Sequence, residues 1–274
     1  MERRTVFFVS DQTGVTAETM GHSVLTQFDG QAFRQVTLPF VSSVDKAHEA
    51  VRRINATAET EHVRPIIFST LVQEELREII KHANGLVLDF FDAFLGPLEL
   101  ELKTASSRAQ GKAHGMQDIG AYTMRINATN FALANDDGAV THDYERADLI
   151  LVGVSRSGKT PTCLYMALQY GIFAANYPFA DEEFETGRLP ASLIKHERKL
   201  YGLTIAPERL QQIRNERKPN SRYASPAQVE YELRAAEGLF RRYGIPFIST
   251  TETSIEEIAS RILDQTGVER RLRP

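Results

Sequence analysis

The chain has 274 residues, 42% of them hydrophobic and 25% charged, which is ordinary for a globular protein with a sizeable core. Its formal net charge is −4, whereas bulk nucleic-acid binding needs a basic surface. A single cysteine excludes an internal disulfide, and no apolar run approaches the roughly 18 residues of a membrane helix. We therefore expect a cytoplasmic protein, long enough for two domains, with no nucleic-acid or membrane partner.

The first third of the chain alternates short apolar runs with helical patterns. Strands are expected at Thr5–Ser10, Gln35–Val41, Arg64–Ser69 and Gly85–Phe91. Helices are expected between them at Thr16–Phe28, Asp45–Asn55 and Val72–His82. Strands that alternate with helices indicate βαβ units and a mainly parallel sheet. Residues 1–103 are therefore predicted to form an N-terminal α/β domain.

The segment Lys103–Asp118 has no clear apolar period and is rich in Ser, Gly and basic residues. Such a composition is typical of a linker or a loop. We place the domain boundary there, with residues 104–118 as the linker and residues 119–274 as the second domain.

The second domain repeats the α/β pattern. Strands are expected at Ala147–Val154, Ile172–Pro178, Tyr201–Ile205 and Ile245–Ser249. Helices are expected at Thr160–Tyr170, Pro207–Arg217 and Ala227–Tyr243, and Thr253 with Glu256 predicts a capping box that opens the last helix. The predicted class is α/β, with an N-terminal parallel α/β domain and a C-terminal P-loop kinase-like domain.

The segment Gly153–Thr160 (GVSRSGKT) fits the pattern G-x-x-x-x-G-K-[ST], between an apolar strand and a helical stretch. Gly153 and Gly158 permit the unusual dihedral angles of a loop that wraps a phosphate. Lys159, expected to be exposed in the loop, would neutralise the terminal phosphates, and the Thr160 hydroxyl would ligate Mg²⁺. The alternative is a glycine-rich turn with a solvated lysine, which the flanking strand and helix disfavour.

Between the two glycines lie Val154, Ser155, Arg156 and Ser157, whose backbone N–H groups would point at the bound phosphate. The Arg156 guanidinium either bridges phosphate oxygens or faces solvent, and the sequence does not decide between the two.

Motifs in both halves of the chain resemble those of the bifunctional regulatory proteins of phosphoenolpyruvate synthase and of pyruvate, phosphate dikinase. The loop with its Pro-Thr extension, residues 153–162, is the most specific of them. The others are Ser10-Asp11 with Gly14, Thr16, Ala17 and Glu18; Asp136-Asp137-Gly138; Ala174–Pro178; Tyr201–Ile205 with Arg209-Leu210 and Ile213-Arg214; and Ser254 with Glu256-Glu257. Leu38-Pro39-Phe40 and Asn220–Ser225 are more similar to the synthase branch.

The resemblance implies two opposed activities on phosphoenolpyruvate synthase as the protein substrate. One is a serine/threonine-protein kinase activity with ADP as the phosphoryl donor, which inactivates the synthase. The other removes the phosphate with inorganic phosphate and releases pyrophosphate. The sequence leaves open whether both activities use one site, which residue is the catalytic base, and whether the protein is a homodimer.

Phosphoryl transfer also needs carboxylates, one to position the attacking hydroxyl and one to hold Mg²⁺. Asp136 and Asp137, just before the loop strand, are the candidates, although Asp-Gly is also an ordinary turn signal. Asp89 ends an apolar strand in the first domain, where a structural or capping role is expected. Cys163 is expected in the core.

Two further segments are weaker candidates for a site. Ser10–Gly14 follows the first strand, where parallel sheets bind ligands. Asp11 argues against a simple phosphate cradle but not against hydrogen bonds to a target or a sugar, and the alternative is a tight turn that caps a helix. The basic run Arg214–Arg222 either holds a phosphate or an acidic partner, or is a solvated loop, as most such runs are. His114 and His142 show no metal-ligand spacing.

Two other functions are compatible with the loop alone. A small-molecule kinase that uses ATP would turn over without a protein substrate, and a non-catalytic nucleotide sensor would bind without turnover.

Overall fold

A computed structural model describes residues 3–108, 119–138 and 141–272 of the chain. The chain divides into two compact units, Met1–Gly115 and Met116–Pro274, called unit 1 and unit 2 below. Their boundary lies within the segment expected to be a linker, and residues 109–118 of that segment are outside the described part.

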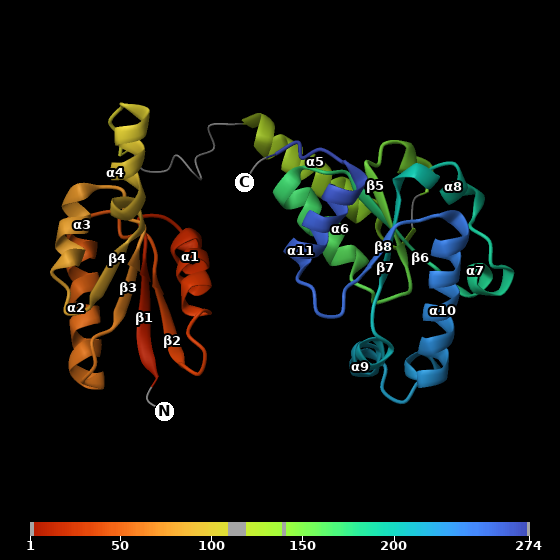
Figure 1. Cartoon of the computed structure of the whole chain (residues 1–274), viewed down its shortest axis with the longest axis horizontal. Helices are drawn as coiled ribbons and strands as arrows, with labels where there is room; N and C mark the ends of the chain where they lie inside the picture. Colours follow the sequence, from red (N-terminus) through yellow and green to blue (C-terminus); the bar gives the residue numbers. More distant parts are fainter. Residues whose placement is uncertain (1–2, 109–118, 139–140, 273–274) are drawn as a thin grey trace. The chain divides into compact units, whose positions relative to one another are not determined.

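Unit 1 is a parallel four-stranded sheet with helices on both faces (Figure 1). Its strands, in the spatial order β2-β1-β3-β4, are β1 (Arg4–Val9), β2 (Phe33–Leu38), β3 (Ile66–Ser69) and β4 (Leu86–Asp89). Helix α1 (Val15–Leu25) packs on the face that carries Val6 and Phe8. Helices α2 (Val44–Glu61) and α3 (Glu74–Lys81) pack on the face that carries Phe7 and Val9, because side chains alternate along a strand.

Unit 2 holds a second parallel four-stranded sheet, in the order β6-β5-β7-β8. Its strands are β5 (Leu149–Gly153), β6 (Ala174–Pro178), β7 (Leu200–Thr204) and β8 (Phe247–Ser249). One face is covered by α5 (Ile119–Ala134), α6 (Lys159–Tyr170) and α11 (Ile255–Thr266) (Figure 1). The other is covered by α7 (Asp181–Thr186), α8 (Ala191–Ile194), α9 (Pro207–Arg217) and α10 (Pro226–Tyr243). The predicted α/β class is confirmed.

The two sheets have the same topology. In each unit the first strand lies between the second and third, so the chain reverses direction across the sheet after its second strand. In each unit the turn after the first strand ends at a glycine with positive φ that precedes a helix, Gly14 (φ 87°) before α1 and Gly158 (φ 93°) before α6. Parallel sheets bind ligands at such a reversal, outside the carboxyl ends of the strands.

Several elements differ from the sequence-based expectations. Helix α4 (Phe90–Leu102) starts directly at the end of β4, where the sequence predicted that the strand continues, and α5 was not predicted at all. The predicted capping box of Thr253 is wrong, because Ser254 caps α11 and accepts from Glu257 N at 3.2 Å. The Thr253 hydroxyl instead donates to the Ser249 carbonyl at 3.4 Å.

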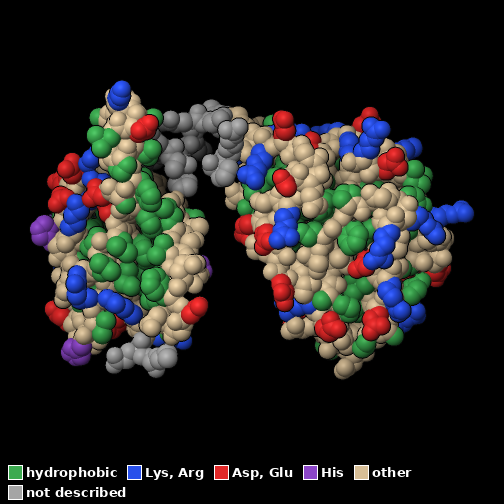
Figure 2. All heavy atoms as spheres, in the orientation of Figure 1, with side chains coloured by type: hydrophobic (Ala, Val, Ile, Leu, Met, Phe, Trp, Pro, Cys, Tyr) green, Lys and Arg blue, Asp and Glu red, His purple; other side chains and the backbone are tan. Residues whose placement is uncertain are grey.

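The surfaces of the two units differ in composition. Hydrophobic side chains gather on the visible face of unit 1, whereas Lys, Arg, Asp and Glu are interspersed on that of unit 2 (Figure 2). Helix α4 buries none of its residues, and Leu100 on it is 82% exposed. None of the helices in the described part of the chain combines the length and the hydropathy needed to cross a membrane.

Candidate functional site

The loop Gly153–Thr160, called the glycine loop below, leads from the carboxyl end of β5 into the first turn of α6. Its two glycines are needed for different reasons. A Cβ on Gly153 would lie 2.4 Å from the Leu203 carbonyl oxygen of the neighbouring strand β7. A Cβ on Gly158 would make only an ordinary contact, 3.9 Å from Thr250 Cγ2, but Gly158 has a φ of 93°, which residues with a side chain rarely adopt. Arg156 also has a positive φ, 73°, so the backbone is held in an uncommon conformation at this point.

Lys159 is buried, and the expectation of an exposed lysine is wrong. Its side chain is 4% exposed and turns back under the glycine loop, where Nζ donates to the carbonyls of Val154 at 2.8 Å and Gly153 at 3.2 Å. Burial lowers the pKa of Lys159 to about 8, and the neighbouring Asp137 carboxylate opposes that shift. The lysine is thus fixed at the base of the loop, with its charge close to two carboxylates.

Thr160 and Asp136 meet although they lie on opposite sides of β5 in the sequence. The Thr160 hydroxyl donates to Asp136 Oδ1 at 2.8 Å. Asn176, fully buried on β6, donates from Nδ2 to the same Asp136 oxygen and accepts from Asp137 N at 3.1 Å through Oδ1. Asp137 is exposed and has φ 51° in the turn that was expected from the Asp-Gly pair. The structure therefore brings both predicted aspartates to the glycine loop.

The basic run Arg214–Arg222 is not a uniformly solvated loop. Arg214, the last-turn arginine of α9, is fully buried and pairs with Glu232 on α10 at 2.6 Å. Its guanidinium lies over the ring of Tyr223 at 4.2 Å and donates to the Ser155 carbonyl at 3.1 Å. The Tyr223 hydroxyl lies 2.9 Å from Ser155 Oγ. Sequence reasoning missed this connection because an arginine within a charged run gives no signal of burial.

Several weaker candidates have structural roles or lie in unit 1. Asp89 caps α4 by accepting from Asp92 N at 3.0 Å, which confirms its capping role. Cys163 is buried in the core of unit 2, as expected, and burial raises the pKa of its thiol. The Ser10–Gly14 turn lies in unit 1. His142 is exposed, 3.8 Å from Asp143, and His114 is outside the described residues.

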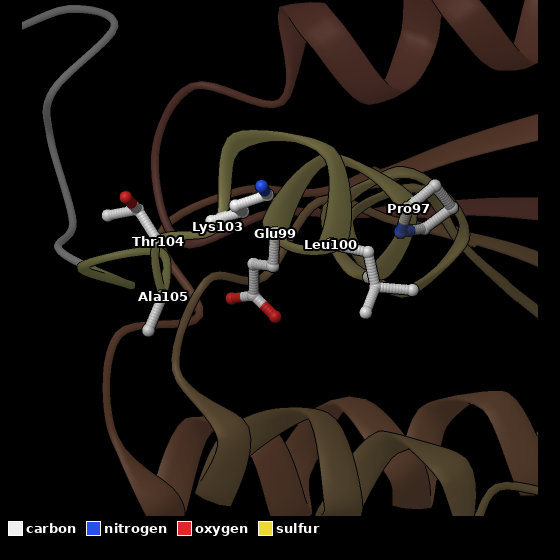
Figure 3. Close-up of a pocket in the computed structure, with 7 residues that line it drawn as sticks. Pro97, Glu99, Leu100, Lys103, Thr104 and Ala105 are labelled. Carbon is white, nitrogen blue, oxygen red and sulfur yellow. The ribbon is translucent and has the colours of Figure 1, made fainter.

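A surface hollow in unit 1 does not offer a second catalytic group (Figure 3). It is lined by Gly96, Pro97, Glu99, Leu100, Lys103, Thr104 and Ala105 at the end of α4. Its carboxylate, Glu99, is occupied in closing the turn, since it accepts from both the N–H (2.9 Å) and the hydroxyl (2.5 Å) of Ser106. These hydrogen bonds lower the pKa of Glu99. The candidate site is therefore the glycine loop.

Comparisons with known proteins identify the family of the chain. A family model described as "Kinase/pyrophosphorylase" matches residues 6–263. A protein of Ectopseudomonas mendocina (strain ymp) is 57% identical over 99% of this chain and 100% of its own length. Proteins of Pseudomonas putida (strain GB-1) and Stutzerimonas stutzeri (strain A1501) are 56% and 55% identical with the same coverage. All three carry the name "Putative phosphoenolpyruvate synthase regulatory protein". This chain belongs to the kinase/pyrophosphorylase family.

Proposed function

We propose that this protein regulates phosphoenolpyruvate synthase by moving a phosphoryl group onto and off a threonine of that enzyme. ADP would donate the phosphoryl group in one direction, and inorganic phosphate would accept it in the other. The names of the relatives support the target, and the family description supports the pair of reactions. The observation that carries the proposal is the meeting of Lys159, Thr160 and Asp136 at the end of β5.

The glycine loop suits a phosphate on three counts. Its Lys159 ammonium lies at the base of the loop, the N-terminus of α6 contributes a positive dipole end, and the loop itself takes positive-φ conformations that let N–H groups converge. In addition, the Ser157 hydroxyl is fully buried and has no hydrogen-bond partner among the described residues. A buried polar group without a partner is costly, and a bound phosphate or an ordered water would relieve that cost.

The residues also fit Mg²⁺. No group of three or more His, Cys, Asp or Glu side chains in the described part of the chain is arranged to hold a metal ion. Mg²⁺ does not need one, because at nucleotide sites it takes one or two protein oxygens and completes its shell with phosphate oxygens and water. The Thr160 hydroxyl and the Asp136 carboxylate are the two oxygens that would hold it. Bound Mg²⁺ would neutralise charge on the phosphates.

In the forward reaction, the threonine Oγ of the synthase would attack the β-phosphorus of ADP. A new P–O bond forms to threonine, the bond to the oxygen that bridges the α- and β-phosphorus breaks, and AMP leaves. The exposed Asp137 would take the hydroxyl proton, as a general base. In the opposite reaction, an oxygen of inorganic phosphate attacks the phosphothreonine, the threonine oxygen leaves and regains a proton, and pyrophosphate is released.

The decisive experiment follows protein-bound phosphate on purified synthase. We expect labelling from β-³²P-ADP, and release of the label as pyrophosphate after inorganic phosphate is added. Lys159→Ala should lose labelling, whereas Lys195→Ala, an exposed lysine at the end of α8, should keep it. ATP turnover without synthase would favour a small-molecule kinase, and ADP binding without any transfer would favour a nucleotide sensor.

A further inference from the structure

Two side chains from outside the glycine loop hold its backbone carbonyl groups. Arg214 Nη2, on α9, donates to the Ser155 carbonyl at 3.1 Å. Thr250 Oγ1, just after β8, donates to the Ser157 carbonyl at 3.1 Å. The loop is therefore hydrogen-bonded to two segments that lie far from it in the sequence.

These contacts fix the direction of two N–H groups. In a trans peptide the C=O and N–H bonds point to opposite sides, and the described residues contain no cis peptide. The Ser155 carbonyl shares its peptide with the N–H of Arg156, and the Ser157 carbonyl shares its peptide with the N–H of Gly158. Because both carbonyls point toward their donors, the N–H groups of Arg156 and Gly158 point away from those donors.

The donors are themselves held in place. Arg214 is fully buried, is paired with Glu232 and donates from Nη1 to the Tyr223 carbonyl at 3.1 Å. The single proton of the Thr250 hydroxyl is shared between the carbonyls of Ser157 and Thr204, 3.1 and 3.2 Å away, and the Thr250 N–H donates to the Thr204 carbonyl at 2.8 Å. Neither donor can swing away without losing other contacts. The positive φ of Arg156, which is uncommon outside glycine, persists only where surrounding contacts impose it, and Arg214 supplies such a contact.

We infer that Arg214 and Thr250 are positioning residues, which aim the N–H groups of Arg156 and Gly158 at the phosphate in the glycine loop. This inference rests on the proposed function, because it takes the ligand to be the β-phosphate of ADP or inorganic phosphate. Neither residue touches the ligand. Each acts through a peptide group, so that the backbone N–H groups of the loop are already oriented before the phosphate binds.

The test is a titration of the ¹⁵N-labelled full chain with inorganic phosphate and with ADP, followed by NMR. In the wild type, the amide resonances of both Arg156 and Gly158 should shift. In Thr250→Val, which removes only the hydroxyl, the Gly158 shift should shrink while that of Arg156 persists, and phosphate should bind about tenfold more weakly. Arg214→Lys keeps the positive charge but loses the paired N–H donors of the guanidinium. In this variant the Arg156 shift should shrink while that of Gly158 persists.

Two variants serve as controls. Thr250→Ser restores the hydroxyl and should restore the affinity. Thr253→Val removes a hydroxyl in the same segment that donates to Ser249 rather than to the glycine loop, and it should bind as the wild type does. A structural role alone would lower the melting temperature in Thr250→Val without this residue-specific change in amide shifts. If Arg214→Lys does not fold, the Thr250 series still decides.

The outcomes separate the two proposals. If phosphate shifts the loop amides equally in wild type and in folded Thr250→Val, with equal affinity, the positioning inference is overturned and the proposed function stands. If phosphate shifts no amide of the glycine loop in the wild type, both are overturned.

Discussion

At the scale of single residues, the burial of Lys159 sets the electrostatics of the site. An ammonium group removed from water is costly, and two backbone carbonyls compensate that cost in part. Its pKa of about 8 lies below the usual 10.5, so the folded chain releases this proton more readily than the unfolded chain does. A bound phosphate would restore the charged form, because an anion beside the ammonium favours it.

We predict that ADP binding is coupled to proton uptake near pH 8.5, where the free lysine is partly neutral. Calorimetry in two buffers with different ionisation enthalpies should show the uptake in the wild type. Lys159→Met should show none and should bind ADP about 10- to 100-fold more weakly, since a charge-assisted hydrogen bond is lost. An equal proton uptake in Lys159→Met would assign the proton to another group.

The same residue has a consequence for stability. The unfolded chain binds more protons than the folded chain between pH 8 and 10.5, so the cost of burying Lys159 is full below pH 8 and fades as pH rises to 10.5. Lys159→Met should therefore melt at a higher temperature than the wild type at pH 7, and the difference should shrink toward pH 10. Thermal unfolding monitored by circular dichroism at the two pH values measures it. A difference that does not change with pH would contradict this account.

Substitutions of Asp136 and Asp137 should affect different measured quantities. Asp137→Asn should slow transfer by about 10² to 10⁴ with little change in ADP affinity, because the exposed carboxylate is free to act as a base. Asp136→Asn should instead raise the Mg²⁺ concentration needed for half-maximal activity, because Asp136 contacts Thr160. Transfer kinetics over a range of Mg²⁺ concentrations distinguish the two. If Asp137→Asn changes only the melting temperature and not the transfer rate, Asp137 has a structural role in the turn and no role in transfer.

At the scale of elements, the two ends of the glycine loop tolerate change differently. Gly153→Ala should destabilise the protein and displace the loop, since its Cβ would collide with the backbone of β7. Gly158→Ala would make only an ordinary contact, 3.9 Å from Thr250 Cγ2, and should cost only the strain of a positive φ, about 1–2 kcal/mol. Chemical denaturation of both variants, together with a measurement of ADP affinity, checks that Gly153→Ala is the more destabilising of the two. Equal losses would place the strain elsewhere in the loop.

The strands and the loop were predictable from the sequence because their signals are local. Apolar runs mark β5 and β7, and the pattern GVSRSGKT marks the turn. Helix α4 was not predicted because it contains Gly96 and Pro97, and both residue types are unfavourable inside a helix. The roles of Asn176, Arg214 and Thr250 depend on contacts between residues 40 to 93 positions apart, which no local pattern encodes.

At the scale of the whole molecule, every residue placed at the candidate site belongs to unit 2. Each unit has its own hydrophobic core on both faces of its sheet. We therefore predict that residues 116–274, produced alone, fold and bind ADP with an affinity within about threefold of the full chain. Calorimetry on the isolated segment tests this, and a folded segment without ADP affinity would show that unit 1 contributes to binding.

The two directions of transfer should compete for one loop, because pyrophosphate resembles the α- and β-phosphates of ADP. Rising ADP should inhibit the removal of phosphate from the synthase, and inorganic phosphate should overcome that inhibition. Lys159→Ala should lose both activities. Full dephosphorylation by Lys159→Ala would require a second phosphate site, and the exposed cations Arg217, Lys218 and Arg222 would then be the next residues to test.

Because the two units share one topology, the turn after β1 can be compared directly with the turn after β5. The turns after β1 and β5 are equally long and end at glycines of nearly equal φ, so Val15 occupies the place of Lys159, and Asp11 that of Ser155. The turn of unit 2 has the buried cation Lys159 beneath it, whereas the turn of unit 1 has Val15, which is 55% exposed, at the matching position and the carboxylate of Asp11 in its bend. Backbone shape alone would nominate both turns as phosphate sites. The two turns therefore differ in charge, and we expect only the turn that contains Lys159 to bind phosphate.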